Sequence, residues 1–162
     1  MKFAKTMRRC LCAGVLSVAA AAAWAGRFSI SADGQEVTDG LTNLVWRRCA
    51  EGMSWNGSTC TGYDATAFTH EAALQRAAAE AAGSGKAWRL PNIKELSSLV
   101  DWTRTPGFDP TAFPATPANP CWSATPNFGD TSYVWVIEFN TNEVYREYRG
   151  VPRTVRLVRA GP

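Results

Sequence analysis

Arginines near the C-terminal end of the chain have the residue type and spacing to bind anions. They lie in a stretch that also holds Glu143 and Glu147: Arg146, Arg149, Arg153, Arg156 and Arg159. A guanidinium group binds carboxylate, sulfate or phosphate through paired hydrogen bonds. If the stretch forms a hairpin that presents these side chains together, its first four arginines form a site for an anionic polysaccharide. The alternative is that they pair with glutamates across a sheet or face solvent.

Aromatic side chains in loops offer a second way to bind a sugar. Trp102 and Phe128 lie in loops or at the ends of expected elements, as do Trp55 and Tyr63. Because an exposed aromatic ring can stack on a sugar ring, Trp102 and Phe128 are predicted ligand contacts. The alternative is that these rings pack in the core, where most large aromatic side chains of a small domain lie.

Acidic residues in and around the long loop at 103–120 make calcium a candidate ligand. Asp101, Asp109 and Asp130 can each supply oxygen ligands, and Ca²⁺ requires several that converge. The Glu-Pro-Asn or Gln-Pro-Asp motif of calcium-dependent sugar binders, followed by Trp-Asn-Asp, is missing from the sequence. We therefore expect no metal and no cofactor, and assign these aspartates to turns and caps. Calcium bound at the three aspartates is the alternative.

No set of residues has the composition of a catalytic site. His70 is the only histidine, and Leu74 stands where a zinc-protease helix requires its second histidine. The sequence also lacks nucleophile-elbow, P-loop and dinucleotide-binding motifs. We therefore expect a protein that is not an enzyme. His70 is interpreted as an exposed residue in the first turn of a helix.

Three cysteines follow residue 25. Cys49 and Cys60 are the expected disulfide, which would close a short loop and stabilise the fold by about 3 kcal/mol. Two free thiols, or part of a metal site, are the alternatives. Cys121 is interpreted as a small buried side chain beside Trp122, with a reactive thiol as the alternative.

The first 25 residues have the pattern of a secretory signal peptide. Basic residues precede an apolar run over 11–23: Lys2, Lys5, Arg8 and Arg9. Ala23-Trp24-Ala25 is a small-x-small cleavage site, and an uncleaved anchor is the alternative. Without this segment, which holds no acidic residue, 13 Lys and Arg stand against 14 Asp and Glu, a net charge of −1 with His neutral. This balance argues against a nucleic-acid partner, and no membrane span is expected after the signal.

The hydrophobic pattern of residues 26–162 predicts one α+β domain, with two helices packed on antiparallel sheet. The expected order is strands at 28–30 and 41–46, helices at 69–82 and 92–102, a loop at 103–120, and strands at 122–125, 133–139, 143–149 and 153–159. The loop cannot be helical because it contains five prolines: Pro106, Pro110, Pro114, Pro117 and Pro120. The last strands form a C-terminal meander.

The stretch Trp88–Leu96 contains the sharpest local signal. Pro91 restricts Leu90 to an extended conformation, and Asn92 with Glu95 forms a capping box that begins a helix. Together with Cys121–Pro126 and Val155–Arg159, this stretch resembles the Lcl C-terminal domain family of bacterial envelope domains. The resemblance implies a C-type-lectin-like fold, in which the first and last strands pair and the long loop carries ligand-binding variation.

The resemblance and the residues together predict an exported, non-catalytic binding or adhesion module. Its expected partner is a carbohydrate, in particular an anionic polysaccharide, or another envelope component. Periplasm, cell surface and medium are all consistent with the sequence, and the oligomeric state is open. A structural subunit of a pilus or envelope assembly is the alternative. A remote alternative is an enzyme of the formylglycine-generating type, which would depend on Cys121.

Overall fold

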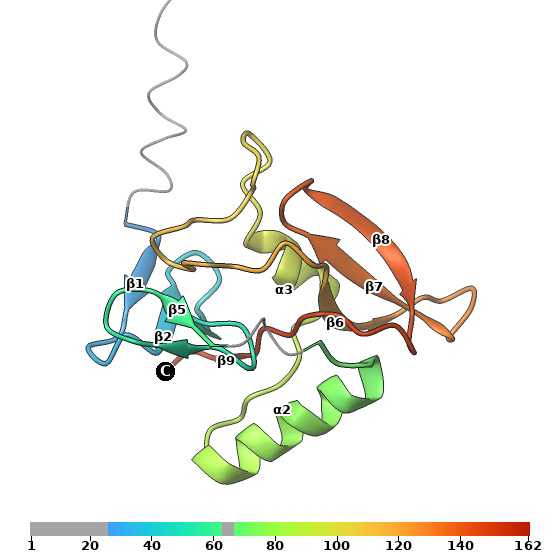
Figure 1. Ribbon diagram of the computed structural model, residues 1–162, viewed down its shortest axis with the longest axis horizontal. Helices are drawn as coiled ribbons and strands as arrows, with labels where there is room; N and C mark the ends of the chain where they lie inside the picture. The colour runs from blue at the N-terminus through green and yellow to red at the C-terminus, as the bar shows by residue number, and fades with distance from the viewer. Residues whose placement is uncertain (1–25, 63–66) are drawn as a thin grey trace, which may run out of the picture.

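The computed structural model describes residues 26–62 and 67–162. The signal-peptide prediction for residues 1–25, and Tyr63 among the candidate aromatic residues, lie outside the described residues. The described part is an α+β structure with two helices and antiparallel sheets (Figure 1), which confirms the predicted class. None of the helices in this part is long and apolar enough to cross a membrane.

One sheet combines the beginning and the end of the chain. Its order is β1-β2-β3-β9, all antiparallel, with β1 at Phe28–Ile30, β2 at Glu36–Asp39, β3 at Leu44–Arg47 and β9 at Val158–Ala160. The prediction that the first and last strands pair is wrong, because β9 pairs with β3 and β1 lies at the opposite edge. The strand expected at 41–46 begins later, since Asn43 adopts a left-handed conformation (φ 53°) in the preceding turn.

A second sheet is the meander β6-β7-β8, with β6 at Cys121–Pro126, β7 at Tyr133–Glu138 and β8 at Glu143–Tyr148. The prediction of a strand over 153–159 is wrong for most of its length. Residues 153–157 cross from this sheet to the first one, held by single bridges such as Phe68 to Arg153 and Cys121 to Thr154. Only the end of the stretch forms a strand, β9, and it belongs to the other sheet.

The helices begin where their caps predict. Thr69 caps α2 (His70–Ser84) by accepting a hydrogen bond from the Ala72 amide, and the Asn92–Glu95 capping box begins α3. α3 covers only Ile93–Ser98, shorter than expected. Its end tightens because the amides of Leu99 and Val100 donate to carbonyls three residues back. The segment 99–120 that follows contains turns and bends.

Two hydrophobic clusters lie on opposite faces of the β6-β7-β8 sheet. Leu96 of α3 packs with Cys121 and Ile137 in one cluster, whereas Ala73 of α2 packs with Trp122 and Val136 in the other. Neighbouring residues of a strand point to opposite faces, so α2 and α3 cover opposite sides of this sheet (Figure 1). The helices leave β8, the edge strand, largely uncovered.

The disulfide between Cys49 and Cys60 is present, with the two Cα atoms 5.5 Å apart, and confirms that prediction. It closes a loop that contains the two-residue strands β4 (Ser54–Trp55) and β5 (Cys60–Thr61). The loop therefore has a fixed shape beside the first sheet. Its Trp55 ring lies against Arg48, the residue that follows β3.

Candidate functional site

The side of the β7–β8 hairpin that carries odd residues of β7 and even residues of β8 presents three aromatic rings that are at least partly exposed. In register, Tyr133 lies opposite Tyr148, and Trp135 lies opposite Arg146. We call these four residues the aromatic face. α3 covers this side of the sheet only near Ile137, which is fully buried. Tyr148 is 53% exposed and Arg146 is also exposed, while the other two rings are half-buried.

The aromatic face combines rings with a cation that no acid neutralises. The Tyr133 and Tyr148 rings meet edge-to-face with centroids 6.0 Å apart. The Arg146 guanidinium lies 5.3 Å from the Tyr133 ring centroid and forms no ion pair with any residue of the described chain. Rings of this kind can pack on the apolar face of a sugar, and a free guanidinium can donate to a carboxylate, sulfate or hydroxyl.

The sequence reasoning missed the aromatic part of this face. The alternation of Tyr133, Trp135 and Ile137 with valines was visible, but it fits either a core-facing or a solvent-facing side. The structure decides the question, because Val134 and Val136 are fully buried while Tyr133 and Trp135 remain partly open. The charged residues of β8, Glu143, Arg146 and Glu147, were the available signal for an exposed edge strand.

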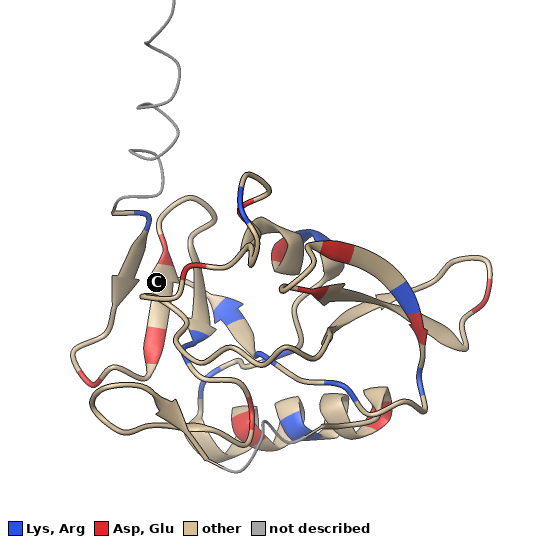
Figure 2. Cartoon of the chain, turned by 45° about the horizontal axis from the view of Figure 1, so that its top comes forward, with Lys and Arg blue, Asp and Glu red and all other residues tan. Residues whose placement is uncertain are grey.

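The predicted arginine patch does not form. Figure 2 shows lysines and arginines spread over several elements rather than gathered at the C-terminal end. Arg153 pairs with Glu147, as the cross-strand alternative expected. Arg159 pairs with Glu36, at 2.7 Å. Arg149 donates from Nε to the Thr131 carbonyl at 2.5 Å.

Arg156 is the clearest correction, because it is 3% exposed and cannot belong to a surface patch. Its guanidinium donates to the carbonyls of Arg47 and Arg48 and to the Thr116 hydroxyl, and it lies 4.8 Å from the Phe113 ring centroid. Burial lowers its pKa to about 10. The error has a physical cause: residues 153–157 run between the two sheets, so both sides of this stretch are covered. Of the predicted arginines, Arg146 keeps a free, exposed side chain.

Trp102 and Phe128 are both exposed, the latter completely. They lie at opposite ends of the β7–β8 hairpin. Asn142, in the turn between the two strands, donates to the Arg104 carbonyl close to Trp102, whereas Asn127, the neighbour of Phe128, donates its amide to the Tyr133 carbonyl. The two rings therefore flank the hairpin, and their role as ligand contacts stays a prediction.

The three calcium candidates do not converge. Asp101 accepts from Thr103, Asp109 from the amides of Thr111 and Ala112, and Asp130 from the Ser132 amide. Each carboxylate thus holds its own turn. Among residues 26–62 and 67–162, no group of three or more His, Cys, Asp or Glu side chains is arranged to hold a metal ion.

His70 is buried, with 2% of its surface exposed, so its interpretation as an exposed helix residue is wrong. Its Nε2 lies 3.1 Å from the Ser123 carbonyl and its Nδ1 lies 2.8 Å from Nη1 of Arg149. The carbonyl only accepts, so Nε2 carries the proton and Nδ1 accepts from the guanidinium. Burial, reinforced by the charge of Arg149, lowers the pKa of His70 despite the opposing carbonyl.

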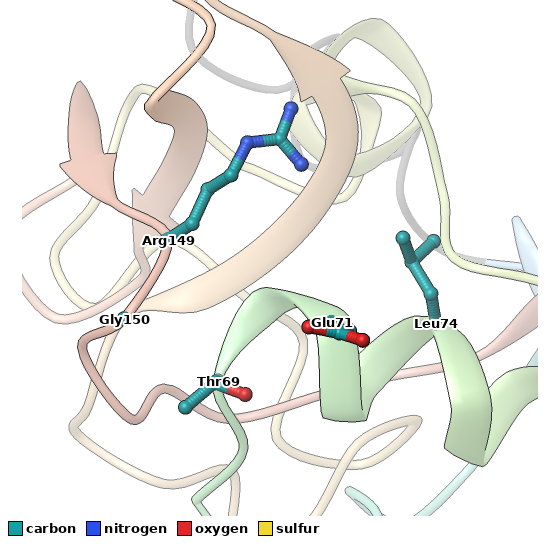
Figure 3. Close-up of a pocket in the computed structure, with 5 residues that line it drawn as sticks. All are labelled: Thr69, Glu71, Leu74, Arg149 and Gly150. Carbon is teal, nitrogen blue, oxygen red and sulfur yellow. The ribbon is translucent and has the colours of Figure 1, made fainter.

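The contact between His70 and Arg149 borders the hollow of about 470 Å³ shown in Figure 3. Thr69, Glu71 and Leu74 line it from the start of α2, and Arg149 and Gly150 line it from the segment after β8. The Arg149 side chain is committed to His70 and Thr131. The hollow therefore marks where α2 meets the sheet, and its arginine is already committed to protein groups.

The neutral state of His70 predicts that the protein loses stability in mild acid. The unfolded imidazole takes up a proton near pH 6.5 and the folded one only at lower pH, so the free energy of unfolding falls as the pH drops below about 6.5, by at most about 1.4 kcal/mol per pH unit. The carboxylates of Glu36, Asp39 and Glu95 lose their ion pairs only at lower pH, because hydrogen bonds from their cationic partners lower their pKa values despite burial. Urea unfolding between pH 5 and 7 measures the slope.

His70→Gln is the matched variant for this measurement, since a glutamine amide can donate to the Ser123 carbonyl and does not titrate. We expect its unfolding free energy to vary less with pH in that range than that of the parent protein. Identical slopes for the two proteins would show that another group causes the acid sensitivity.

Cys121 is a free cysteine with a buried side chain. Burial raises the pKa of its thiol, although the charge of Arg156 and nearby hydrogen bonds oppose the shift. We expect Cys121 to resist iodoacetamide in the native protein and to react only after unfolding with the disulfide intact, because the thiolate is the nucleophile. Mass spectrometry measures the label. Rapid labelling of the native protein would favour the reactive-thiol alternative.

Comparison with known proteins gives one family. The model of the Lcl C-terminal domain matches residues 35–159 of the chain. This range begins next to β2 and ends within β9, so it contains both helices and the aromatic face and leaves out β1. The comparison with curated proteins gave no match.

Proposed function

The chain belongs to the Lcl C-terminal domain family, and on that premise we propose that it is an extracytoplasmic, non-catalytic module that binds carbohydrate through the aromatic face. Family membership indicates an envelope-associated domain, and the Cys49–Cys60 disulfide agrees with an oxidising compartment. The α+β arrangement of two helices and antiparallel sheets is compatible with the C-type-lectin-like fold that the resemblance implies.

The observation that carries this proposal is the exposed Arg146 guanidinium, without an ion pair in the described chain, beside the partly exposed rings of the aromatic face. Among the arginines that the sequence favoured, Arg146 is the one whose charge is available to a ligand. Tyr133, Trp135 and Tyr148 offer apolar surface next to it. A sugar with an acid group fits this combination, since the ring can pack on the aromatics while the acid group pairs with the guanidinium.

Binding of the purified protein to immobilised uronic, sulfated and neutral glycans at two salt concentrations tests the proposal. We expect saturable binding to acidic glycans that weakens with salt, because a single exposed charge pair is screened. If neutral glycans bound as tightly as acidic ones at both salt concentrations, the aromatic rings alone would account for binding. Binding that is unchanged by Arg146→Gln would contradict the proposed part of Arg146.

A subunit of an envelope assembly is the second candidate, and one observation favours it. β8 is the edge strand of its sheet, and Val144 and Tyr148 expose apolar surface along it. An edge strand can pair with another chain, although charged residues such as Glu143 and Arg146 oppose such pairing. Concentration-dependent self-association that Val144→Lys abolishes, without glycan binding, would favour this candidate.

A further inference from the structure

A second hollow lies between the β1–β2 turn and the disulfide-closed loop. The residues that line it are far in sequence from those of the aromatic face. The hollow has a volume of about 580 Å³. Ala32, Asp33 and Gln35 line it from the turn, and Arg48 and Trp55 line it from the other side. We call it the Arg48 groove. Its size is within the range of small-molecule sites.

Arg48 is a buried cation without an acid partner. It is 7% exposed, and among the described residues no carboxylate forms an ion pair with it. Arg27, which is equally buried, pairs with Asp39. Burial of Arg48 lowers its pKa, and no acidic group counteracts this effect. A charge in this position is costly unless something compensates it.

The guanidinium of Arg48 is held in place with one nitrogen left over. Nε donates to the Ala112 carbonyl at 3.2 Å and Nη2 to the Thr111 carbonyl at 3.1 Å. Its centre lies 3.6 Å from the Trp55 ring centroid. None of these interactions uses Nη1. The orientation is therefore fixed by the protein, and two donors at Nη1 have no acceptor within the described chain.

Trp55 packs closely against the β1–β2 turn. Its indole Nε1 would lie 2.3 Å from a Cβ atom at position 34, where the chain has Gly34 with a φ of +70°. Glycine is therefore required on both steric and conformational grounds. The ring forms part of the groove wall without rearrangement, as a preorganised surface.

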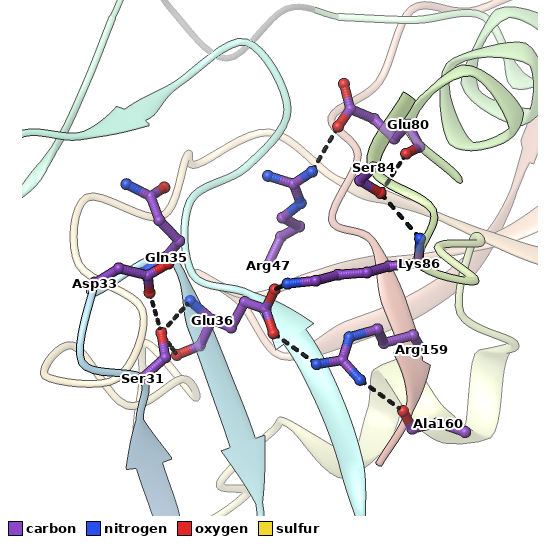
Figure 4. A network of polar contacts seen from close by, with 10 residues as sticks. All are labelled: Ser31, Asp33, Gln35, Glu36, Arg47, Glu80, Ser84, Lys86, Arg159 and Ala160. Atoms are coloured by element: carbon purple, nitrogen blue, oxygen red, sulfur yellow. Dashed lines mark hydrogen bonds and ion pairs between the residues drawn. The ribbon is translucent and has the colours of Figure 1, made fainter. Parts of the chain in front are cut away.

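Polar groups on the opposite wall are also unused. One carboxylate oxygen of Asp33 accepts from Ser31 and from the Gln35 amide (Figure 4), while the other accepts no hydrogen bond from residues 26–62 and 67–162. The Gln35 side-chain amide makes no hydrogen bond within the described chain. These hydrogen bonds hold the pKa of Asp33 below its usual value, so its carboxylate is charged at neutral pH. It can accept a hydrogen bond from a hydroxyl group of a ligand, whereas it repels an anionic group.

We propose that the Arg48 groove binds a small hydroxylated carboxylate, with the acid group at Nη1 of Arg48, the hydroxyls at Asp33 and Gln35, and the carbon skeleton against Trp55. A sugar acid and an open-chain hydroxy acid share this chemistry. A second carboxylate on the ligand would be repelled by Asp33. The site is independent of the aromatic face and of the proposed function, because it belongs to the other sheet.

Ala32 provides a matched pair of variants, because it lines the groove and its side chain is exposed. Ala32→Glu places a negative charge at the groove, and Ala32→Gln adds nearly the same volume without charge. Replacement of Arg48 itself would also release residues 111–112, so it is not a clean test. At low ionic strength we expect Ala32→Glu to weaken carboxylate binding about fivefold relative to Ala32→Gln.

The probes are galacturonate, gluconate, acetate and galactose, each added to the purified protein while the Trp55 indole N–H is followed by NMR. We expect a saturable shift with galacturonate that exceeds those with acetate and galactose. If gluconate gives a comparable shift, the site binds hydroxy acids in general. If only galacturonate gives a shift, the site is specific for sugar acids. No saturable shift with either, an equal response to galactose, or equal affinities of the two Ala32 variants would overturn the proposal.

Discussion

Asp39→Asn should lower the free energy of unfolding by about 3–5 kcal/mol, because it leaves a buried arginine without its counter-charge. Asp39 is fully buried, and its carboxylate meets Arg27 through two hydrogen bonds of 2.8 and 2.6 Å. It also accepts from the Leu41 amide and the Thr42 hydroxyl. These interactions lower the pKa of Asp39 although burial opposes the shift.

The effect should extend beyond one strand, because Nη2 of Arg27 also donates to the Ser98 carbonyl at the end of α3. Urea unfolding at pH 7 measures it. Asp33→Asn is the matched control, since Asp33 lies in an exposed turn and should cost about 1 kcal/mol or less. If the two variants lost similar amounts of unfolding free energy, the buried Arg27–Asp39 pair would not stabilise the fold as strongly as its geometry indicates.

Trp135→Ala combined with Tyr148→Ala should weaken glycan binding about 30-fold or more, if the aromatic face is the binding surface. Aromatic residues at the centre of an interface each contribute on the order of 1–2 kcal/mol or more, and a factor of ten corresponds to about 1.4 kcal/mol. Tyr148 is an exposed residue of an edge strand, so its share of the loss should not come from unfolding. Binding of a fixed glycan by calorimetry measures the change.

Leu41→Ala is the matched control for this experiment, because Leu41 is an exposed apolar residue in the β2–β3 turn. Tyr148→Phe should retain most of the affinity, since it keeps the ring. A double variant that binds as tightly as the parent, with thermal unfolding unchanged, would move the glycan site away from the aromatic face. Loss of binding in the Leu41 variant would instead indicate a different surface.

Local signals in the sequence predicted local structure well. The capping box at Asn92 and Glu95 and the Thr69 cap depend on atoms a few residues apart. The Cys49–Cys60 disulfide was also predictable, since both cysteines follow the proposed signal and lie close together in the chain. In each case the partners are neighbours along the backbone.

The burial and the partners of the ionisable side chains were not predictable in the same way. Arg149 binds His70, 79 residues away, and Arg156 binds the carbonyl of Arg47, 109 residues away. A cluster of arginines in sequence carries no information about which of them the fold will bury. The long-range placement left Arg146 exposed and made Arg48, which the sequence did not single out, the unpaired cation of a groove.

The sequence by itself therefore determined the family, the α+β class, the starts of both helices and the disulfide, because these follow from spacing and local hydrogen bonding. Only the tertiary structure decided that the last strand joins β3, that His70 and Arg156 are buried, and that rings and a free guanidinium share one face of β7–β8. The physical reason is that burial and pairing depend on which distant segments come together, and a strand pattern read alone does not specify its neighbour.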